Sequence, residues 1–309
     1  MKLAVGEREV RLFNRFGIKP LVSRFILLKP INVVLLAFAR RFLPITISSR
    51  LPLNRNYVEY RSSSGNTVRL CRPNRDIVAR DIYWGGGRPT SAADALVLDI
   101  FDRLCREAQT FVDIGTYAGL FALVAARANE HIAVVAYDIV PENYLLALSN
   151  VLANDMVGRI DCHLLGMGAE PGTICVPPVL GLSSNALSVS LGSRFGHGIG
   201  IPITTLDQQA KNWKAPVLMK IDVEGFELEV LTGGSTLLAE HRPDIICEIL
   251  PGNDEEIARL QDVLRRYDYH FFRPIRENLV EFDQITPTLA ARDWLFTTDV
   301  DRMKRLSVV

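Results

Sequence analysis

The strongest constraint on the fold is a repeated change of hydrophobic period after residue 110. Short apolar runs typical of buried strands alternate with longer segments in which apolar residues recur at helical spacing. The strand-like runs are 110–114, 131–137, 160–165, 216–221 and 245–250. The helical segments are 117–128, 141–154, 226–240 and 254–267. Strands that alternate with helices form parallel sheets covered on both faces, so we expect an α/β fold.

Other segments indicate how the chain is divided. A helix is predicted over 92–107, and three closing antiparallel strands are predicted over 269–273, 279–282 and 294–297. We therefore expect the main domain to span 92–309, with an insertion over 166–204 that is rich in Gly, Ser and Pro. Long irregular insertions are often lids or substrate loops. Residues 1–91 are predicted to form an extension of short helices and a strand pair.

Charge is distributed unevenly along the chain. The 35 Lys and Arg residues balance the 35 Asp and Glu residues, yet residues 1–60 contain eleven basic residues and three acidic ones. Basic segments favour phosphate-bearing partners or anionic membranes. Lys29, Pro30, Arg40 and Arg41 interrupt the apolar stretch 25–43, so we expect neither a membrane-spanning helix nor a cleaved signal peptide. Peripheral membrane contact through residues 1–55 and packing on the main domain both stay open.

The five cysteines are scattered and form no CxxC pair, which argues against a disulfide framework and a zinc site. We interpret them as reduced thiols and expect a cytoplasmic protein, with peripheral membrane association as the open option. The acidic main domain has no basic stripe interleaved with aromatic residues. Nucleic acid is therefore not an expected partner.

A glycine turn follows the first strand of the main domain. Gly115 leaves room for a ligand to approach the turn, and Gly119 lets the next helix pack closely. Asp113 precedes the turn, and the third glycine of the dinucleotide-binding pattern is missing. A carboxylate here would repel a pyrophosphate, so the turn favours a ligand with a cationic end.

The second strand ends in Asp138, where a carboxylate can accept both hydroxyls of a ribose. Together with the glycine turn, it indicates an adenosine that bears a positive group, namely S-adenosylmethionine. The structural alternatives are that Asp113 caps a helix and that Asp138 is a turn residue.

Charged residues also gather around the strand 216–221. Strand alternation places Lys220 and Asp222 on one face, and Glu224 and Glu227 follow at its carboxyl end. The neighbouring strand ends near Glu248, at the same edge. Glu224 and Glu227 could merely stabilise a helix N-terminus, with Lys220 neutralising Asp222. However, a Lys–Asp pair inside a parallel sheet is costly to desolvate, which favours a functional role.

Residues 220–227 (KIDVEGFE), followed by Val230, Leu231 and Gly233, resemble the signature of FkbM-type methyltransferases. These are S-adenosylmethionine-dependent class I methyltransferases. Residues 112–115, 205–207 and 242–248 agree with the other motifs of the family, and the resemblance covers about 110–273. It implies a Rossmann-like fold with a mostly parallel seven-stranded sheet, helices on both faces and an antiparallel C-terminal strand. Thr116 and Tyr117 replace the usual Ala-Asn, and Asp138 replaces the commoner Glu.

The resemblance implies O-methylation of a hydroxyl on a sugar, a glycolipid or polysaccharide, or a secondary metabolite. The candidate catalytic residues are Asp222, Glu224, Glu248 and Lys220. The candidate cofactor-binding residues are Asp113, Gly115, Thr116, Tyr117, Gly119, Asp138, Ile139 and Gly168. The candidate substrate-binding residues are Asn185, Ser188 and His197.

Asp222 is the first choice for the base that takes the hydroxyl proton, and Glu224 or Glu248 comes next. His163 and His197 are fallback choices. We expect no required metal, with Mg²⁺ held by Asp222 and Glu248 as the option. The alternatives are an NAD(P)-dependent oxidoreductase and a non-catalytic domain that binds a nucleotide or a partner. A homodimer also stays open.

Overall fold

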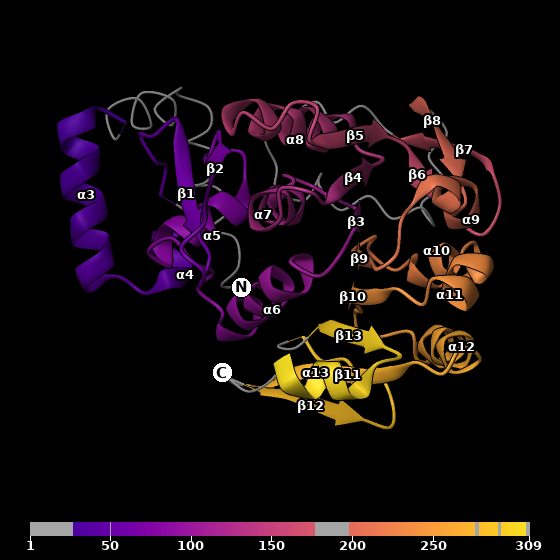
Figure 1. The fold of residues 1–309 in the computed structure, drawn as a ribbon. Helices are drawn as coiled ribbons and strands as arrows, with labels where there is room; N and C mark the ends of the chain where they lie inside the picture. Colours follow the sequence, from indigo (N-terminus) through magenta and orange to yellow (C-terminus); the bar gives the residue numbers. More distant parts are fainter. Residues whose placement is uncertain (1–26, 50, 177–197, 276–277, 290–291, 307–309) are drawn as a thin grey trace, which may run out of the picture.

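The predicted apolar runs form the centre of one eight-stranded sheet (Figure 1). The computed structural model describes residues 27–49, 51–176, 198–275, 278–289 and 292–306. In spatial order, the strands are β12 (Asn278–Phe282), β11 (His270–Ile275), β13 (Asp293–Thr297), β10 (Asp244–Glu248), β9 (Val217–Ile221), β3 (Thr110–Ile114), β4 (Ala133–Asp138) and β5 (Ile160–Leu164).

Strands β10, β9, β3, β4 and β5 are parallel, whereas β13 runs antiparallel to both β10 and β11. This arrangement confirms the predicted Rossmann-like α/β fold. The sheet has one strand more than the seven expected, because β12 pairs with β11 at the edge. The strand order reverses between β3 and β9, and in open α/β sheets ligands bind outside the carboxyl ends at such a switch point.

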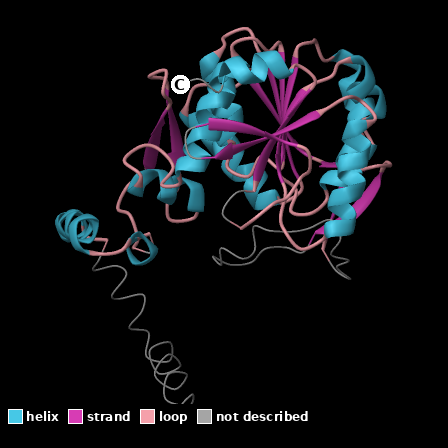
Figure 2. Ribbon diagram, turned by 90° about the horizontal axis from the view of Figure 1, so that it is seen from below, coloured by secondary structure: helices cyan, strands magenta, loops and turns pink. Residues whose placement is uncertain are grey.

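Helices cover both faces of the sheet (Figures 1 and 2). One face carries α6 (Ala92–Cys105), α7 (Leu120–Ala128) and α8 (Pro141–Ala153). The other carries α10 (Glu227–Thr232), α11 (Ser235–Glu240) and α12 (Asp254–Arg265). Successive side chains of β9 enter opposite cores: Leu218 packs with the first set of helices and Met219 with the second. This alternation explains why the central strands are apolar throughout.

The single helix predicted over 226–240 is wrong, because two glycines divide it into α10 and α11. A Cβ on Gly233 would lie 2.1 Å from the carbonyl oxygen of Gly168. A Cβ on Gly234 would lie 2.8 Å from Cδ1 of Leu206. The two helices therefore meet at a point where the backbone must pass very close to its neighbours.

The described ends of the insertion form a small sheet of β6 (Gly166–Met167), β7 (Gly172–Val176) and β8 (Ile199–Thr204). The candidate substrate residues Asn185, Ser188 and His197 lie outside the described residues. After β8, the Thr205 hydroxyl accepts a hydrogen bond from the Gln208 amide at 3.2 Å and begins α9 (Leu206–Gln209), as its capping pattern predicts. A 3₁₀ helix, η2 (Ala210–Asn212), follows.

The extension contains α3 (Lys29–Phe42), α4 (Ile45–Ser48), the predicted strand pair β1 (Tyr57–Arg61) and β2 (Thr67–Cys71), and α5 (Ile77–Trp84). Its side chains share one hydrophobic core with the main domain, where Leu70 and Ile82 lie in the same cluster as Leu123. Among the described helices, which end with α13 (Val300–Leu306), none is both long and apolar enough to cross a bilayer.

Two asparagines, one near the end of α8 and one directly after it, join the extension to the main domain. The Asn150 side chain accepts a hydrogen bond from the Cys71 amide at 2.6 Å and donates one to the Ala118 carbonyl at 2.8 Å. One turn later, Asn154 accepts from the Arg69 amide at 2.8 Å and donates to the Arg69 carbonyl at 2.7 Å. These side chains take the place of a further strand beside β2, because they satisfy its backbone polar groups.

We expect Asn150→Ala to lower the free energy of unfolding by about 1–3 kcal/mol, because it leaves the Cys71 N–H and the Ala118 carbonyl without their partner. Urea unfolding followed by circular dichroism measures the change. Ser149→Ala, at the half-buried neighbouring position on α8, is the matched control. Equal stability of the two variants would contradict this role for Asn150.

Candidate active site

The turns after β3 and β9 touch each other through their backbones. The Asp222 amide donates a hydrogen bond to the Ile114 carbonyl at 2.9 Å. Gly115 has a φ of +80°, and a Cβ at this position would lie 1.8 Å from the Asp222 carbonyl oxygen. Glycine is therefore required for both conformation and space. This contact places the glycine turn directly beside the predicted catalytic residues.

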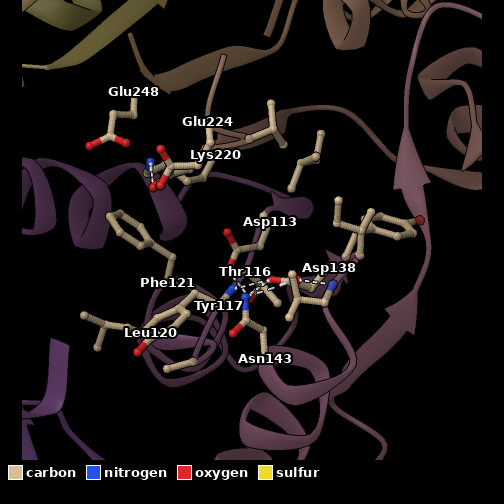
Figure 3. Close-up of a pocket in the computed structure, with 18 of the residues that line it drawn as sticks. Asp113, Thr116, Tyr117, Leu120, Phe121, Asp138, Asn143, Lys220, Glu224 and Glu248 are labelled. Atoms are coloured by element: carbon tan, nitrogen blue, oxygen red, sulfur yellow. Dashed lines mark hydrogen bonds and ion pairs between the residues drawn. The ribbon is translucent and has the colours of Figure 1, made fainter. Parts of the chain in front are cut away.

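A cavity of about 330 Å³ opens at this edge (Figure 3). Its lining includes six predicted cofactor residues and all four predicted catalytic residues: Asp113, Gly115, Thr116, Tyr117, Asp138, Ile139, Lys220, Asp222, Glu224 and Glu248. Gly119 and Gly168 are not part of this lining. Gly119 packs against Ala147 at the start of α7, and Gly168 packs against Gly233.

Asp113 is buried at the base of the glycine turn. Its carboxylate accepts a hydrogen bond from the Thr116 hydroxyl at 2.6 Å. Burial raises the pKa of Asp113 to about 6, although this hydrogen bond and Lys220 act in the opposite direction. An acidic group at this position suits a cationic ligand and disfavours a pyrophosphate.

Asp138 holds the glycine turn as well as lining the cavity. Its carboxylate accepts hydrogen bonds from the amides of Tyr117 and Val140 at 2.9 and 2.8 Å, and from the Asn143 side chain at 3.3 Å. Burial raises the pKa of Asp138 to about 7. With three donors already bound, the carboxylate has less accepting capacity left for a ribose than its position in the sequence suggests.

Lys220 is 3% exposed and lies among carboxylates from three strand ends. Its Nζ is 3.1 Å from Asp222 Oδ2 and 3.7 Å from Asp293 Oδ1, and it faces the Phe121 ring. Burial acts to lower the pKa of Lys220, but Asp222, Asp293 and Glu248 outweigh burial and raise it. The ammonium is therefore charged, and the predicted placement of Lys220 and Asp222 on one face is confirmed.

Asp222 and Glu248 respond in opposite ways to this environment. Burial acts to raise the pKa of Asp222, but Lys220 and a hydrogen bond from Glu248 outweigh it and lower the pKa. Burial and the Asp222 carboxylate raise the pKa of Glu248 to about 8, and Arg292 pairs with Glu248 Oε1 at 3.1 Å. At neutral pH, the two side chains therefore share one proton.

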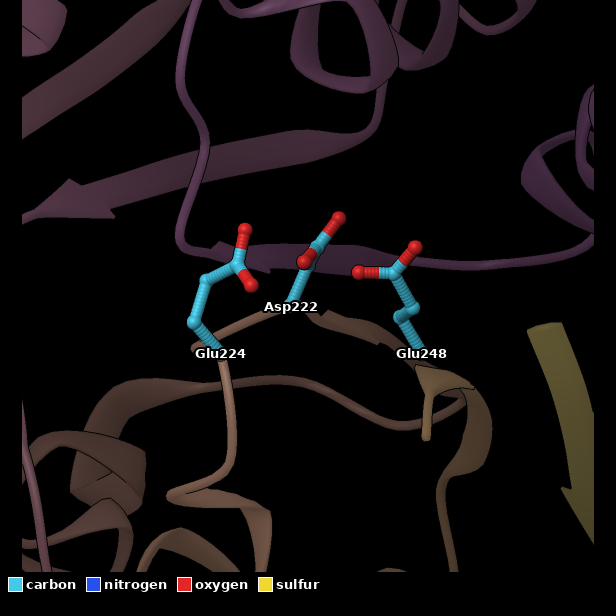
Figure 4. A group of neighbouring side chains, drawn as sticks. All are labelled: Asp222, Glu224 and Glu248. Atoms are coloured by element: carbon cyan, nitrogen blue, oxygen red, sulfur yellow. The ribbon is translucent and has the colours of Figure 1, made fainter. Parts of the chain in front are cut away.

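Glu224 completes a group of three carboxylates (Figure 4). One oxygen each from Asp222, Glu224 and Glu248 lies within 4.8 Å of the others. Carboxylate oxygens are suitable Mg²⁺ ligands, so Glu224 offers the third ligand that the sequence did not identify. Glu227 has a structural role instead, because Oε1 accepts the Gly225 and Val223 amides at 3.1 and 3.4 Å.

The fallback base His163 is not part of the cavity lining. Its ring stacks on Tyr137, and its Nε2 is 3.0 Å from Asp161. The second fallback base, His197, lies outside the described residues.

Sequence reasoning missed several residues at the site, among them four from outside the predicted motifs. Ile77 and Val78 reach the cavity from α5, and Ile77 donates its amide to the Tyr117 hydroxyl at 3.2 Å. Arg292 and Asp293 lie at the beginning of β13, beside Glu248. The direction of β13 could have indicated these two residues, because an antiparallel strand begins where its parallel neighbours end.

The family model described as "Methyltransferase FkbM domain" matches residues 113–271, just over half of the chain. The chain belongs to the FkbM methyltransferase family. The match covers the glycine turn, Asp138 and the carboxylate group, and it confirms the predicted family. The family is one of methyltransferases, which agrees with the predicted enzyme class and its S-adenosylmethionine cofactor.

Three similar proteins have related names. A ribosomal protein L11 methyltransferase from Pelotomaculum thermopropionicum is 27% identical over 40% of this chain and 37% of its own. A methyltransferase FkbM from Methylobacillus flagellatus is 20% identical, with a TM-score of 0.42, over 62% of this chain and 44% of its own. An O-methyltransferase from Bacillus cereus, in complex with SAH, is 14% identical, with a TM-score of 0.38, over 69% of this chain and 84% of its own. The chain spans less than half the length of the first two.

We expect Gly115→Ala to abolish the binding of S-adenosylhomocysteine, because the new methyl group would collide with the Asp222 backbone. Gly158→Ala is the matched control: Gly158 has a φ of +78°, and its Cβ would meet no atom within 4 Å. Left-handed strain alone costs about 1–2 kcal/mol. Calorimetric titration of both variants separates strain from collision. Normal binding by Gly115→Ala would show that the close contact is dispensable.

Proposed function

We propose that this FkbM domain methylates a hydroxyl group of its acceptor. The observation that carries the proposal is the group of Asp222, Glu224 and Glu248 carboxylates, which line the same cavity as the glycine turn. O-methylation requires a base next to the acceptor oxygen and a cofactor held in line with that oxygen. S-adenosylmethionine supplies an electrophilic methyl group and a good leaving group.

The cavity residues fit this cofactor in size, shape and charge. The cavity of about 330 Å³ falls in the range typical of small-molecule sites. Gly115 leaves the turn open, Asp113 provides negative charge for a cationic end, and Asp138 and Asn143 provide polar contacts. The same carboxylates disfavour the pyrophosphate of NAD(P), and the family match disfavours a purely binding domain.

We assign the base to the Asp222–Glu248 pair as a unit. Lys220 keeps Asp222 ionised, which makes Asp222 alone a weak base. Glu248, with a pKa of about 8, is better matched to taking a proton near neutral pH. Once Glu248 has lost its proton, both carboxylates are ionised, and a hydroxyl proton passed to Glu248 then occupies the hydrogen bond to Asp222, while Arg292 holds Glu248 in place.

A divalent cation is the second candidate role for the three carboxylates. The Lys220 ammonium already lies 3.1 Å from Asp222 and supplies the positive charge that a metal would otherwise add. We therefore favour proton transfer over metal binding as the role of this group.

For the acceptor, we propose a sugar hydroxyl, either free or on a glycolipid. A second cavity of about 240 Å³ is lined by Ser91, Asp94, Arg292 and Asp293, among others. Arg292 lines both cavities and pairs with Glu248, so the second cavity lies next to the base. The hydroxyl, carboxylate and guanidinium groups that line the second cavity suit a ligand with many hydroxyls.

We expect kcat to rise with pH and to level off above about pH 8, because Glu248 must lose its proton to act as the base. Below this pKa, the rise should approach about tenfold per pH unit. Glu248→Gln should remove the rise and lower kcat, whereas Glu240→Gln, on α11, serves as the control. Initial rates with labelled methyl donor give both profiles. An unchanged profile in Glu248→Gln would rule out this base.

We expect the chain to bind S-adenosylhomocysteine and not NADH in calorimetric titrations. Asp222→Asn should keep this affinity within about threefold while lowering methyl transfer by about 10²–10⁴-fold, the usual contribution of a positioned base. Transfer is measured with labelled donor on sugar nucleotides, glycolipids and hydroxylated metabolites. Binding of NADH alone would support the oxidoreductase, and binding of neither would support a non-catalytic domain.

A further inference from the structure

Helix α3 presents three distinct faces. The face toward the protein is formed by Asn32, Leu36 and Ala39, which are buried. Asn32 anchors this face, because its side chain donates to the Pro52 carbonyl at 2.8 Å and accepts from the Asn54 amide at 2.9 Å. The helix thus has a fixed orientation, which determines what its other faces expose.

The outward face is apolar and exposed. Val34, Phe38 and Phe42 follow one another at helical spacing and are 70%, 53% and 65% exposed. The rings of Phe38 and Phe42 lie 4.9 Å apart. Ile45 and Ile47 of the adjoining α4 are also exposed. A contiguous apolar surface of this kind on a soluble domain marks a contact site.

The third face borders a basic groove. A cavity of about 750 Å³ runs between α3 and the β1–β2 pair, and its charged lining consists of Lys29, Arg40, Arg55, Arg61 and Glu59. Glu59 lies 3.7 Å from Arg69, and Arg40 donates to the Tyr83 carbonyl at 2.7 Å. Within the described ranges, no ion pair is found for Lys29, Arg55 or Arg61.

Arg41 adds a cation beside the apolar face, because it is exposed and lies over the Phe42 ring. An apolar strip bordered by unpaired cations is complementary to an anionic bilayer, where acyl chains lie directly beneath phosphates. A second copy of the chain would bring the same cations together, so it is a poorer match for this surface.

We propose that the α3–α4 surface binds anionic lipid bilayers. Phe38 and Phe42 enter the acyl boundary, while Lys29, Arg41 and the groove contact lipid phosphates. Leu36 of the same helix is buried and Arg40 donates to the Tyr83 carbonyl, so the contact depends mainly on the other residues of this surface. The surface goes beyond the proposed methyl transfer and requires neither cofactor nor acceptor.

The test is co-sedimentation of the full chain with vesicles of phosphatidylcholine alone or mixed with phosphatidylglycerol. We expect binding to the mixed vesicles that weakens at high salt. Phe38→Ser/Phe42→Ser should lower the partition coefficient by at least about tenfold, because two aromatic side chains no longer leave water. Lys29→Glu/Arg41→Glu should lower it by a similar factor, since two basic groups near the surface no longer attract anionic lipid.

Two matched controls test whether the effect is specific to this surface. Leu145→Ser/Leu152→Ser removes two exposed leucines from α8, and Lys211→Glu/Lys214→Glu reverses two exposed cations elsewhere. Both should bind vesicles as the unchanged chain does, and all four variants should keep their affinity for S-adenosylhomocysteine. That affinity shows that each variant is folded, so loss of vesicle binding reports on the surface alone.

Three outcomes would overturn the proposal. Equal binding to both vesicle types would show that attraction between the basic residues and anionic lipid has no role. Full binding by the Phe38/Phe42 variant, or no binding by the full chain, would show that this face does not contact lipid. A dimer in analytical ultracentrifugation that Phe38→Ser/Phe42→Ser dissociates would assign the face to a second copy of the chain.

Discussion

The buried ammonium of Lys220 is the interaction on which the active site depends. A charge in the middle of a sheet is tolerated only if it is paired, and removing one partner of such a pair is strongly destabilising. Asp222, Asp293 and Glu248 surround Lys220 because β9 and β10 end at the edge where antiparallel β13 begins. Lys220 lowers the pKa of Asp222, and the Asp222 charge then helps to raise that of Glu248. One buried cation thus gives two similar carboxylates different protonation states.

The glycine turn and the carboxylates act together because their backbones are in contact. Gly115 allows the turn after β3 to approach Asp222, and Asp138 fixes the following residue, Tyr117, through its amide. Tyr117 in turn accepts a hydrogen bond from Ile77 of the extension. The extension therefore reaches the cofactor cavity through a short chain of contacts, and its α5 contributes part of the wall. Movement of the extension would change the shape of this wall.

Features encoded by nearby residues could be predicted from the sequence. The period of apolar residues gave the strands and most helices, and the glycine turn and the Lys220–Asp222 face required only strand geometry. Features set by distant contacts could not be predicted. Gly233 and Gly234 divide a helix because Gly168 and Leu206 pack there, and Ile77 reaches the cavity from an extension that is distant in sequence from most of the site. To predict that Asp293 lies beside Glu248, the direction of β13 would have had to be known.

The zero net charge of the chain conceals two surfaces of opposite sign. The carboxylates lie at the carboxyl edge of the sheet, whereas α3 and its basic groove lie beyond the β1–β2 pair (Figure 1). Charges separated by more than about 8 Å are largely screened at physiological salt. Each surface therefore acts on its own partner, with the acidic edge suited to a cationic ligand and the basic groove to phosphates. Neutralising either set would change the net charge and leave the other surface unaffected.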